Sequence, residues 1–240
     1  VILMNPQNGE IYAMASNEEY NLNKPTDLSP FLEEETIASM SEEERLDYLN
    51  AIWRNFAISD TFEPGSTFKP FTIAAGLEEG LIHENQTFVC DGGEEVGGWT
   101  IRCHKRSGHG TITLTEALSQ SCNDALMQIA AKEGRNLFYK YQTFFGFGDK
   151  TGIDLPGEAE GLLTSVENLN SSELATSSFG QTFTVSMVQV AAGYSSLVNG
   201  GNYYKPHIVK QILNDDGAII KEVEAEILKK TVSIKTSDFI

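Results

Sequence analysis

Residues 62–71 read Phe-Glu-Pro-Gly-Ser-Thr-Phe-Lys-Pro-Phe, and they form the most informative stretch of the chain. Pro64-Gly65 is a turn signal, and the apolar residues after it recur at helical spacing, which predicts a helix beginning near Ser66. Residues three apart on a helix share a face, so the Cβ atoms of Ser66 and Lys69 are expected about 5–6 Å apart. A neutral lysine at that distance can take the proton of a serine hydroxyl if burial lowers its pKa. The alternative is that Lys69 is an ordinary solvated lysine.

A second candidate segment, Ser121-Cys122-Asn123, lies between two helical patterns. Thr113 and Glu116 have the spacing of a capping box for the first helix, and an apolar stripe follows in the second. On a short turn between helices, the hydroxyl of Ser121 and the amide of Asn123 can point into one cleft. There the hydroxyl can relay a proton, and the amide can hold a substrate carbonyl or the lysine. The alternative is that Ser121 or Asn123 only caps the second helix.

The two segments together resemble a motif set. Ser-x-x-Lys and a following Ser-x-Asn occur in penicillin-binding proteins and class A β-lactamases. The sequence resembles the transpeptidase domain of class B penicillin-binding proteins, which cross-link bacterial peptidoglycan, and the resemblance covers nearly the whole chain. The segments that carry it are Met4–Ser16, Trp53–Asp60, Glu63–Pro70, Gly152–Glu158, Gly180-Gln181 and Asn199–His207.

Strands predicted at both ends of the chain, with helices between them, favour an α+β fold. The resemblance implies the penicillin-binding protein and serine β-lactamase-like fold, an antiparallel sheet flanked by helices plus a helical lobe. The active site would lie in the cleft between lobe and sheet. We expect residues 1–240 to be a partial transpeptidase domain, incomplete on its C-terminal side. The family's N-terminal membrane helix and pedestal domain would precede Val1.

The resemblance also implies a mechanism, acyl transfer by serine as in a D,D-transpeptidase. Ser66 would attack the carbonyl between two D-alanines of a peptidoglycan stem peptide, and Lys69 would take its proton. Ser121 would pass the proton to the leaving D-alanine. Asn123 would hold the backbone of the donor peptide, and backbone amides would hold the oxyanion. An amine of a neighbouring stem would then resolve the acyl-enzyme. β-Lactams would mimic the donor on Ser66, and neither a metal nor a cofactor is expected.

Three other functions stay open at this point: a serine β-lactamase, a β-lactam sensor domain and a non-catalytic scaffold for cell-wall assembly. The net charge of −17 argues against nucleic acid and against an anionic membrane surface as partners. The resemblance implies that the protein lies at the outer face of a bacterial cell membrane and is anchored there by an N-terminal segment. It also implies a membrane glycosyltransferase as a partner.

The family's third motif, Lys-Thr-Gly, has a match at Lys150-Thr151-Gly152. We interpret this match as a decoy, because a Pro-Gly pair follows closely and favours a loop over a strand that forms a ladder. In the family the catalytic motif lies on an edge strand, well after the segment that matches Lys205-Pro206-His207. The chain is therefore expected to end, at Ile240, before that motif.

Cysteines and histidines gather between residues 90 and 109, namely Cys90, Cys103, His104 and His109. They superficially resemble zinc ligands, but the spacing of the cysteines is too long for a zinc knuckle. A disulfide between Cys90 and Cys103 and a pair of free thiols both stay open. Cys122 is expected to be a small buried residue and not a nucleophile.

The remaining patterns predict a coarse layout. A strand hairpin is expected at residues 1–16, with its turn at Asn8-Gly9, followed by an acidic helical insertion. Short strands are expected between 88 and 110, and helices over 114–133 and 135–145. A capped helix is expected to begin within 164–170, a buried helix over 185–197, and a second hairpin around 214–217.

Overall fold

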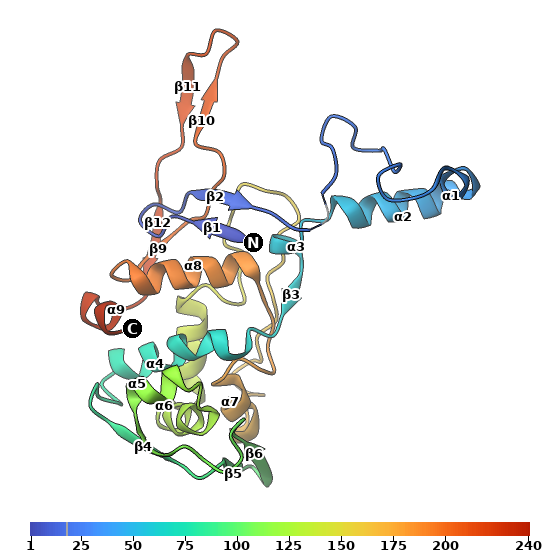
Figure 1. Cartoon of the computed structure of the whole chain (residues 1–240). Helices are drawn as coiled ribbons and strands as arrows, with labels where there is room; N and C mark the ends of the chain where they lie inside the picture. Colours follow the sequence, from blue (N-terminus) through green and yellow to red (C-terminus); the bar gives the residue numbers. More distant parts are fainter. Residues whose placement is uncertain (18) are drawn as a thin grey trace.

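Short antiparallel strand pairs and helices make up the chain, so the fold class is α+β as predicted (Figure 1). The computed structural model describes residues 1–17 and 19–240. The predicted N-terminal hairpin is present, with β1 (Ile2–Met4) antiparallel to β2 (Ile11–Met14). Gly9 has a φ of +83° in the connecting turn, a conformation that glycine adopts without steric cost.

A helix runs through the middle of the molecule where the Ser-x-x-Lys segment predicts it (Figure 1). The 3-10 turn η1 (Gly65–Phe68) leads directly into helix α4 (Lys69–Glu78). Pro70 stands in the first turn of α4, where its missing N–H removes no intrahelical hydrogen bond. The predicted start near Ser66 is confirmed.

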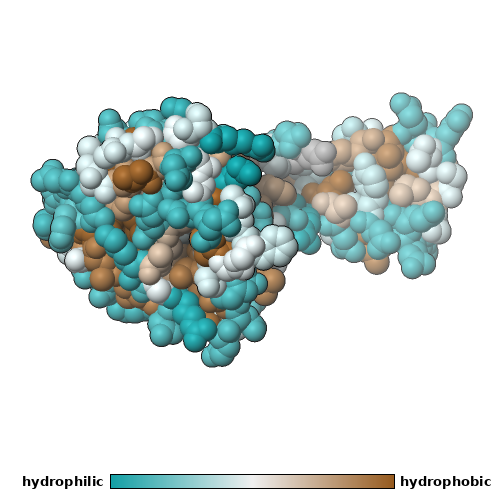
Figure 2. Space-filling view, turned by 90° about the horizontal axis from the view of Figure 1, so that it is seen from below, coloured by the Kyte–Doolittle hydropathy of each residue, from teal (hydrophilic) through white to brown (hydrophobic). Residues whose placement is uncertain are grey.

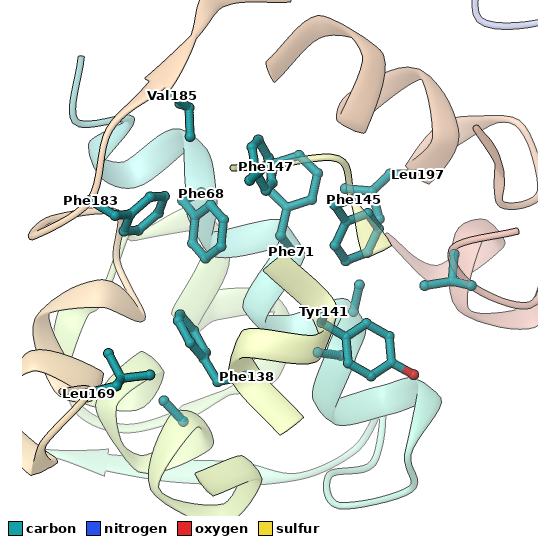
Figure 3. Packing of buried hydrophobic residues seen from close by; sticks show 14 residues of the cluster. Phe68, Phe71, Phe138, Tyr141, Phe145, Phe147, Leu169, Phe183, Val185 and Leu197 are labelled. Carbon is teal, nitrogen blue, oxygen red and sulfur yellow. The ribbon is translucent and has the colours of Figure 1, made fainter. Parts of the chain in front are cut away.

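The η1–α4 segment rests on an aromatic core, shown in Figure 3. The rings of Phe68 and Phe183 meet edge to face with centroids 4.8 Å apart, and Phe71 meets Phe147 at 5.0 Å. Such aromatic pairs stabilise by about 0.5–1.5 kcal/mol beyond their buried area. Because Phe68 is buried two residues after Ser66, the core fixes the turn that presents the serine.

On one side of α4 lies a layer that joins both ends of the chain (Figure 1). Helix α8 (Met187–Val198) packs against β1 and against β9 (Asn202–Tyr204), which pairs with β12 (Ile227–Lys230). A bridge between Glu10 and His207 connects this pair to the N-terminal hairpin. The buried helix predicted over 185–197 is α8, whose N-terminus carries a capping box.

On the other side of α4 lies a lobe built from the middle of the chain (Figure 1). Strand β4 (Thr87–Cys90) pairs with β7 (Gly110–Thr113), and β5 (Gly93–Val96) pairs with β6 (Trp99–Arg102). These are the short strands predicted between 88 and 110. The predicted capping box of Thr113 is present and opens helix α5 (Leu114–Ser119).

Helix α6 (Asn123–Phe144) follows α5 and packs against α4. The helix predicted over 114–133 is thus two helices, separated by residues 120–122. Gly134 has non-helical φ and ψ of 68° and 161°, so the backbone does break where the two predicted helices were separated. Glycine lowers helical stability by about 1 kcal/mol relative to alanine and permits this conformation.

The prediction that a helix begins within residues 164–170 is wrong. These residues form turns, and helix α7 (Ser171–Ser177) starts after them. The hydroxyl of Thr164 donates to a backbone carbonyl 18 residues later, at 3.3 Å, and so does not cap a helix. Asn170 instead accepts from two backbone N–H groups of α7 and forms the capping box with Glu173.

Two segments project from the body (Figure 1). The predicted acidic insertion forms α1 (Glu34–Ser39) and α2 (Glu42–Trp53), which Figure 2 shows as a separate lobe with polar and apolar residues mixed on the visible face. The predicted second hairpin is β10 (Gln211–Leu213) paired with β11 (Ile219–Glu222), and its strands are exposed throughout.

Shorter elements complete the chain: α3 (Phe56–Ser59), β3 (Thr61–Phe62), β8 (Val185–Ser186) and α9 (Ile234–Phe239). Strand β3 pairs with β8 and leads into the turn that carries the serine. Among the described residues, no helix has the length and apolar character needed to cross a bilayer.

Candidate active site

The predicted site residues come together in the structure. The hydroxyl of Ser121 donates to Oγ of Ser66 at 2.9 Å. The ammonium of Lys69 donates to Oγ of Ser121 at 2.8 Å and to Oδ1 of Asn123 at 2.7 Å. The four side chains predicted from two segments more than 50 residues apart therefore form one connected network, with Ser121 as the link between the lysine and Ser66.

Lys69 is almost completely buried, with 1% of its surface exposed. Besides the two side-chain contacts, its Nζ donates to the backbone carbonyl of Ser121 at 2.6 Å. An ammonium has three N–H donors, and here each has an acceptor. Burial nevertheless lowers the pKa of Lys69 from 10.5 to about 8, because the surrounding protein solvates the charge less well than water does. The expectation of a buried lysine with a lowered pKa is met, and Lys69 is not a solvated lysine.

Ser66 is exposed and lies within the 3-10 turn that precedes α4. The N–H groups of a first helical turn have no intrahelical acceptor, so they are available to an oxyanion. The dipole of the helix also favours negative charge at this end. An exposed hydroxyl beside free backbone donors and a network that leads to a buried amine is an arrangement suited to nucleophilic acyl transfer.

Ser121 has a φ of +52°, which is rare for a residue with a side chain. Its neighbour Cys122 is the N-cap of α6, where Sγ accepts from the N–H of Ala125 at 3.5 Å, and Asn123 is the first helical residue. The alternative that Ser121 or Asn123 caps the helix is therefore wrong. Because Cys122 occupies the cap, both flanking side chains are free to turn toward Lys69. Backbone strain of this kind costs on the order of 1–3 kcal/mol and is concentrated at functional sites.

A contact that the sequence did not reveal holds the serine turn in place. The N–H of Gly65 donates to the carbonyl of Gly180 at 2.8 Å, and Glu63 accepts from the N–H of Thr182 at 2.8 Å. A Cβ on Gly180 would lie 2.1 Å from the carbonyl oxygen of Gly65, so only glycine fits there. Thr182 itself has a φ of +68°. The only sequence signal was the Gly180-Gln181 pair, which gives no hint of its partner.

The Lys150-Thr151-Gly152 match lies in a loop, as predicted, and not on a strand. The N–H and hydroxyl of Thr151 both donate to the carboxylate of Glu158, which also accepts from Gly152. Lys150 forms an exposed ion pair with Glu160 at 3.7 Å. These contacts close the loop on itself and give the match a local structural role.

Of the two arrangements left open for Cys90 and Cys103, the structure has the pair of free thiols. Cys90, Cys103 and Cys122 are all free thiols and all buried. Burial raises the pKa of the Cys122 thiol to about 12, so it is a poor nucleophile, as expected. The spacing of Cys90 and Cys103 along the chain argues against a zinc knuckle, but it takes no account of Cys122. Folding brings Cys122 within 4.0 Å of Cys103, and His109 within 3.3 Å of Cys90.

The family model described as penicillin binding protein transpeptidase domain matches residues 1–239. Stage V sporulation protein D of Bacillus subtilis is 36% identical over 96% of this chain and 33% of its own length. Peptidoglycan D,D-transpeptidase MrdA of Acinetobacter baumannii is 28% identical over 88% of this chain and 32% of its own length. The chain thus spans about a third of the length of these relatives.

Solved structures agree with the fold. The D,D-transpeptidase domain of a peptidoglycan glycosyltransferase from Eggerthella lenta superposes with a TM-score of 0.83 at 25% identity, covering 99% of this chain and 58% of that one. Penicillin binding protein 3 of Mycobacterium tuberculosis, complexed with ampicillin, has a TM-score of 0.82 at 25% identity and covers 99% of this chain and 48% of that one.

Proposed function

The chain belongs to the family of penicillin-binding protein transpeptidase domains, and we propose that it catalyses the D,D-transpeptidation that cross-links peptidoglycan. The observation that carries the proposal is the continuous hydrogen-bonded network from the exposed Ser66 through Ser121 to the buried Lys69. A network of this kind supplies a nucleophile, a proton relay and a base in one connected set of side chains.

The chemistry begins with attack of Ser66 Oγ on the carbonyl between the two D-alanines of a stem peptide. The serine proton moves to neutral Lys69, and the hydroxyl of Ser121, in contact with both groups, offers the path. The N–H of Ser66, in the first turn of the helix, takes part in holding the oxyanion. The C–N bond then breaks, and the proton passes through Ser121 to the nitrogen of the leaving D-alanine.

Asn123 contributes in two ways. Its Oδ1 accepts from Lys69 at 2.7 Å and so helps to fix the amine, while its side-chain N–H₂ group is available to a carbonyl of the donor peptide. An amine of a second stem peptide attacks the acyl-enzyme and forms the cross-link, which releases Ser66. We place this reaction at the outer face of a bacterial cell membrane, where the substrate lies, with a membrane glycosyltransferase as a partner of the whole protein.

The test is intact-mass measurement after incubation with a penicillin. The expected result is one penicilloyl adduct on the wild-type chain, no adduct on Ser66→Ala, and an unchanged adduct on Ser119→Ala, an exposed serine on α5. An adduct that persists supports a transpeptidase, whereas rapid release as hydrolysed penicillin supports a β-lactamase. A folded chain that gains no adduct contradicts the proposed activity and supports a scaffold.

A further inference from the structure

All three cysteines of the chain meet at one place, although they lie far apart in the sequence. Together with one histidine they form what is called here the Cys/His cluster, made of Cys90, Cys103, His109 and Cys122. Their three sulfur atoms and one ring nitrogen all lie within 4.8 Å of one another. The three cysteines are buried, and the histidine is partly exposed.

The separations within the cluster fit a tetrahedral metal ion. With zinc bonds of about 2.3 Å to sulfur and 2.0–2.1 Å to nitrogen, ligand atoms at tetrahedral angles lie about 3.8 Å apart for two sulfurs and about 3.5 Å for sulfur and nitrogen. Sγ of Cys103 lies 4.0 Å from Sγ of Cys122 and 3.7 Å from Nδ1 of His109. Sγ of Cys90 lies 3.3 Å from the same nitrogen. The remaining separations are all within 4.8 Å, so the ligand atoms would move inward by at most about 1 Å to centre an ion among them.

We propose that the Cys/His cluster binds one Zn²⁺ ion as a closed, structural site. Three thiolates and one imidazole form a common structural zinc donor set, and soft thiolates favour zinc over magnesium or calcium. Binding forms three zinc–sulfur bonds and one zinc–nitrogen bond, and it releases the three thiol protons to solvent. With four protein ligands the ion has no open position, so it takes no part in the chemistry of the acyl transfer.

The backbone around the cluster is built to bring the ligands together. Pairing of β4 with β7 sets Cys90 opposite Gly110, which places His109 beside it, and the N–H of Cys103 donates to the carbonyl of Gly92 at 2.9 Å. A Cβ on Gly92 would lie 2.2 Å from a backbone oxygen, and one on Gly108 would lie 2.3 Å from the carbonyl oxygen of Cys90. The ligand loops therefore cross so closely that only glycine fits at two crossing points.

Zinc binding would affect the proposed acyl transfer through Cys122. This ligand lies between Ser121 and Asn123 and caps α6, so a metal bond to its sulfur ties their turn to β4 and β7. The tie would hold Ser121 in its unfavourable backbone conformation, with a φ of +52°. The ion is thus a positioning element for the proton relay. This role rests on the proposed transpeptidase function, whereas the binding of zinc does not.

Metal content is the direct test. The protein is purified with a non-thiol reductant and without chelators, its thiols are counted, and its zinc is measured by elemental mass spectrometry. The expected result is about one zinc ion per chain in the wild type and far less in Cys90→Ser and His109→Ala. The matched control is His104→Ala, because the His104 ring lies 3.8 Å from Cys103 but outside the cluster, and it should keep its zinc.

Cobalt provides a second measurement that needs no variant. Co²⁺ bound to the wild-type protein should give thiolate-to-cobalt charge-transfer absorption and the visible bands of a tetrahedral ion, and added Zn²⁺ should abolish both. The proposal is overturned if the protein has three reduced thiols and takes up neither ion. It is also overturned if Cys90→Ser and His109→Ala both keep their full zinc content. If zinc binds but no penicillin adduct forms, the proposed function fails and the metal site stands. If the site also positions the turn, removing zinc slows the acylation of Ser66 in wild-type protein.

Discussion

Raising the pH from 6 to 9 should accelerate the acylation of Ser66 by a penicillin, because the reaction needs Lys69 in its neutral form. A pKa of about 8 in place of 10.5 raises the neutral fraction at pH 7 from about 0.03% to about 10%. The neutral fraction is about 1% at pH 6 and about 90% at pH 9, so the rate should rise roughly 100-fold and then level off.

The assay is the time course of adduct formation by intact mass at a fixed penicillin concentration below saturation. Background hydrolysis of the penicillin is measured at each pH, and circular dichroism verifies that the chain stays folded. Lys69→Met should lose acylation at every pH, while Lys150→Met, which alters the exposed lysine of the loop match, should keep the wild-type profile. A flat profile, an inflection near 10.5, or wild-type rates in Lys69→Met would each refute the assignment of Lys69 as the base.

The same pKa has a consequence for stability. Below pH 8 both the folded and the unfolded chain carry a charged Lys69, and burying that charge costs about 3 kcal/mol relative to water. Between pH 8 and 10.5 the unfolded chain binds the proton more strongly than the folded chain does. The contribution of Lys69 to the free energy of unfolding therefore rises with pH across this window, and urea titrations of wild type and Lys69→Met would isolate it.

Two substitutions probe the geometry around the serine. Ser121→Ala should slow acylation about 10²- to 10⁴-fold, because it removes the proton relay. The control, Ser119→Ala, changes an exposed serine and should leave the acylation rate unchanged. Comparable acylation rates in the two variants would exclude a relay through Ser121. Gly180→Ala should destabilise the fold by a few kcal/mol in urea unfolding and slow acylation, because its Cβ would lie 2.1 Å from a backbone oxygen of the serine turn. Gly217 also has a positive φ, but an added Cβ there would meet no other atom, so Gly217→Ala should lower the free energy of unfolding by only about 1 kcal/mol. Equal losses of stability in the two glycine variants would contradict a steric clash at Gly180.

Local patterns predicted local structure well in this chain. The Pro64-Gly65 turn, the capping box of Thr113 and the Asn8-Gly9 hairpin depend on residues within a few positions of one another, and all three are present. The prediction for residues 164–170 failed because two capping signals stood close together. Asn170 accepts two backbone N–H groups and defines the start of α7, while Thr164 is bonded elsewhere.

The sequence by itself predicted the family and the four side chains of the candidate site, since motifs with fixed short spacing can be recognised without knowledge of the fold. Only the tertiary structure revealed that Ser121 links Lys69 to Ser66, that Gly180 holds the serine turn, and that Cys122 joins the other cysteines. Each of these contacts joins segments brought together by strand pairing or helix packing. Their separation along the chain carries no information about their distance in space, because long loops close at little additional entropic cost.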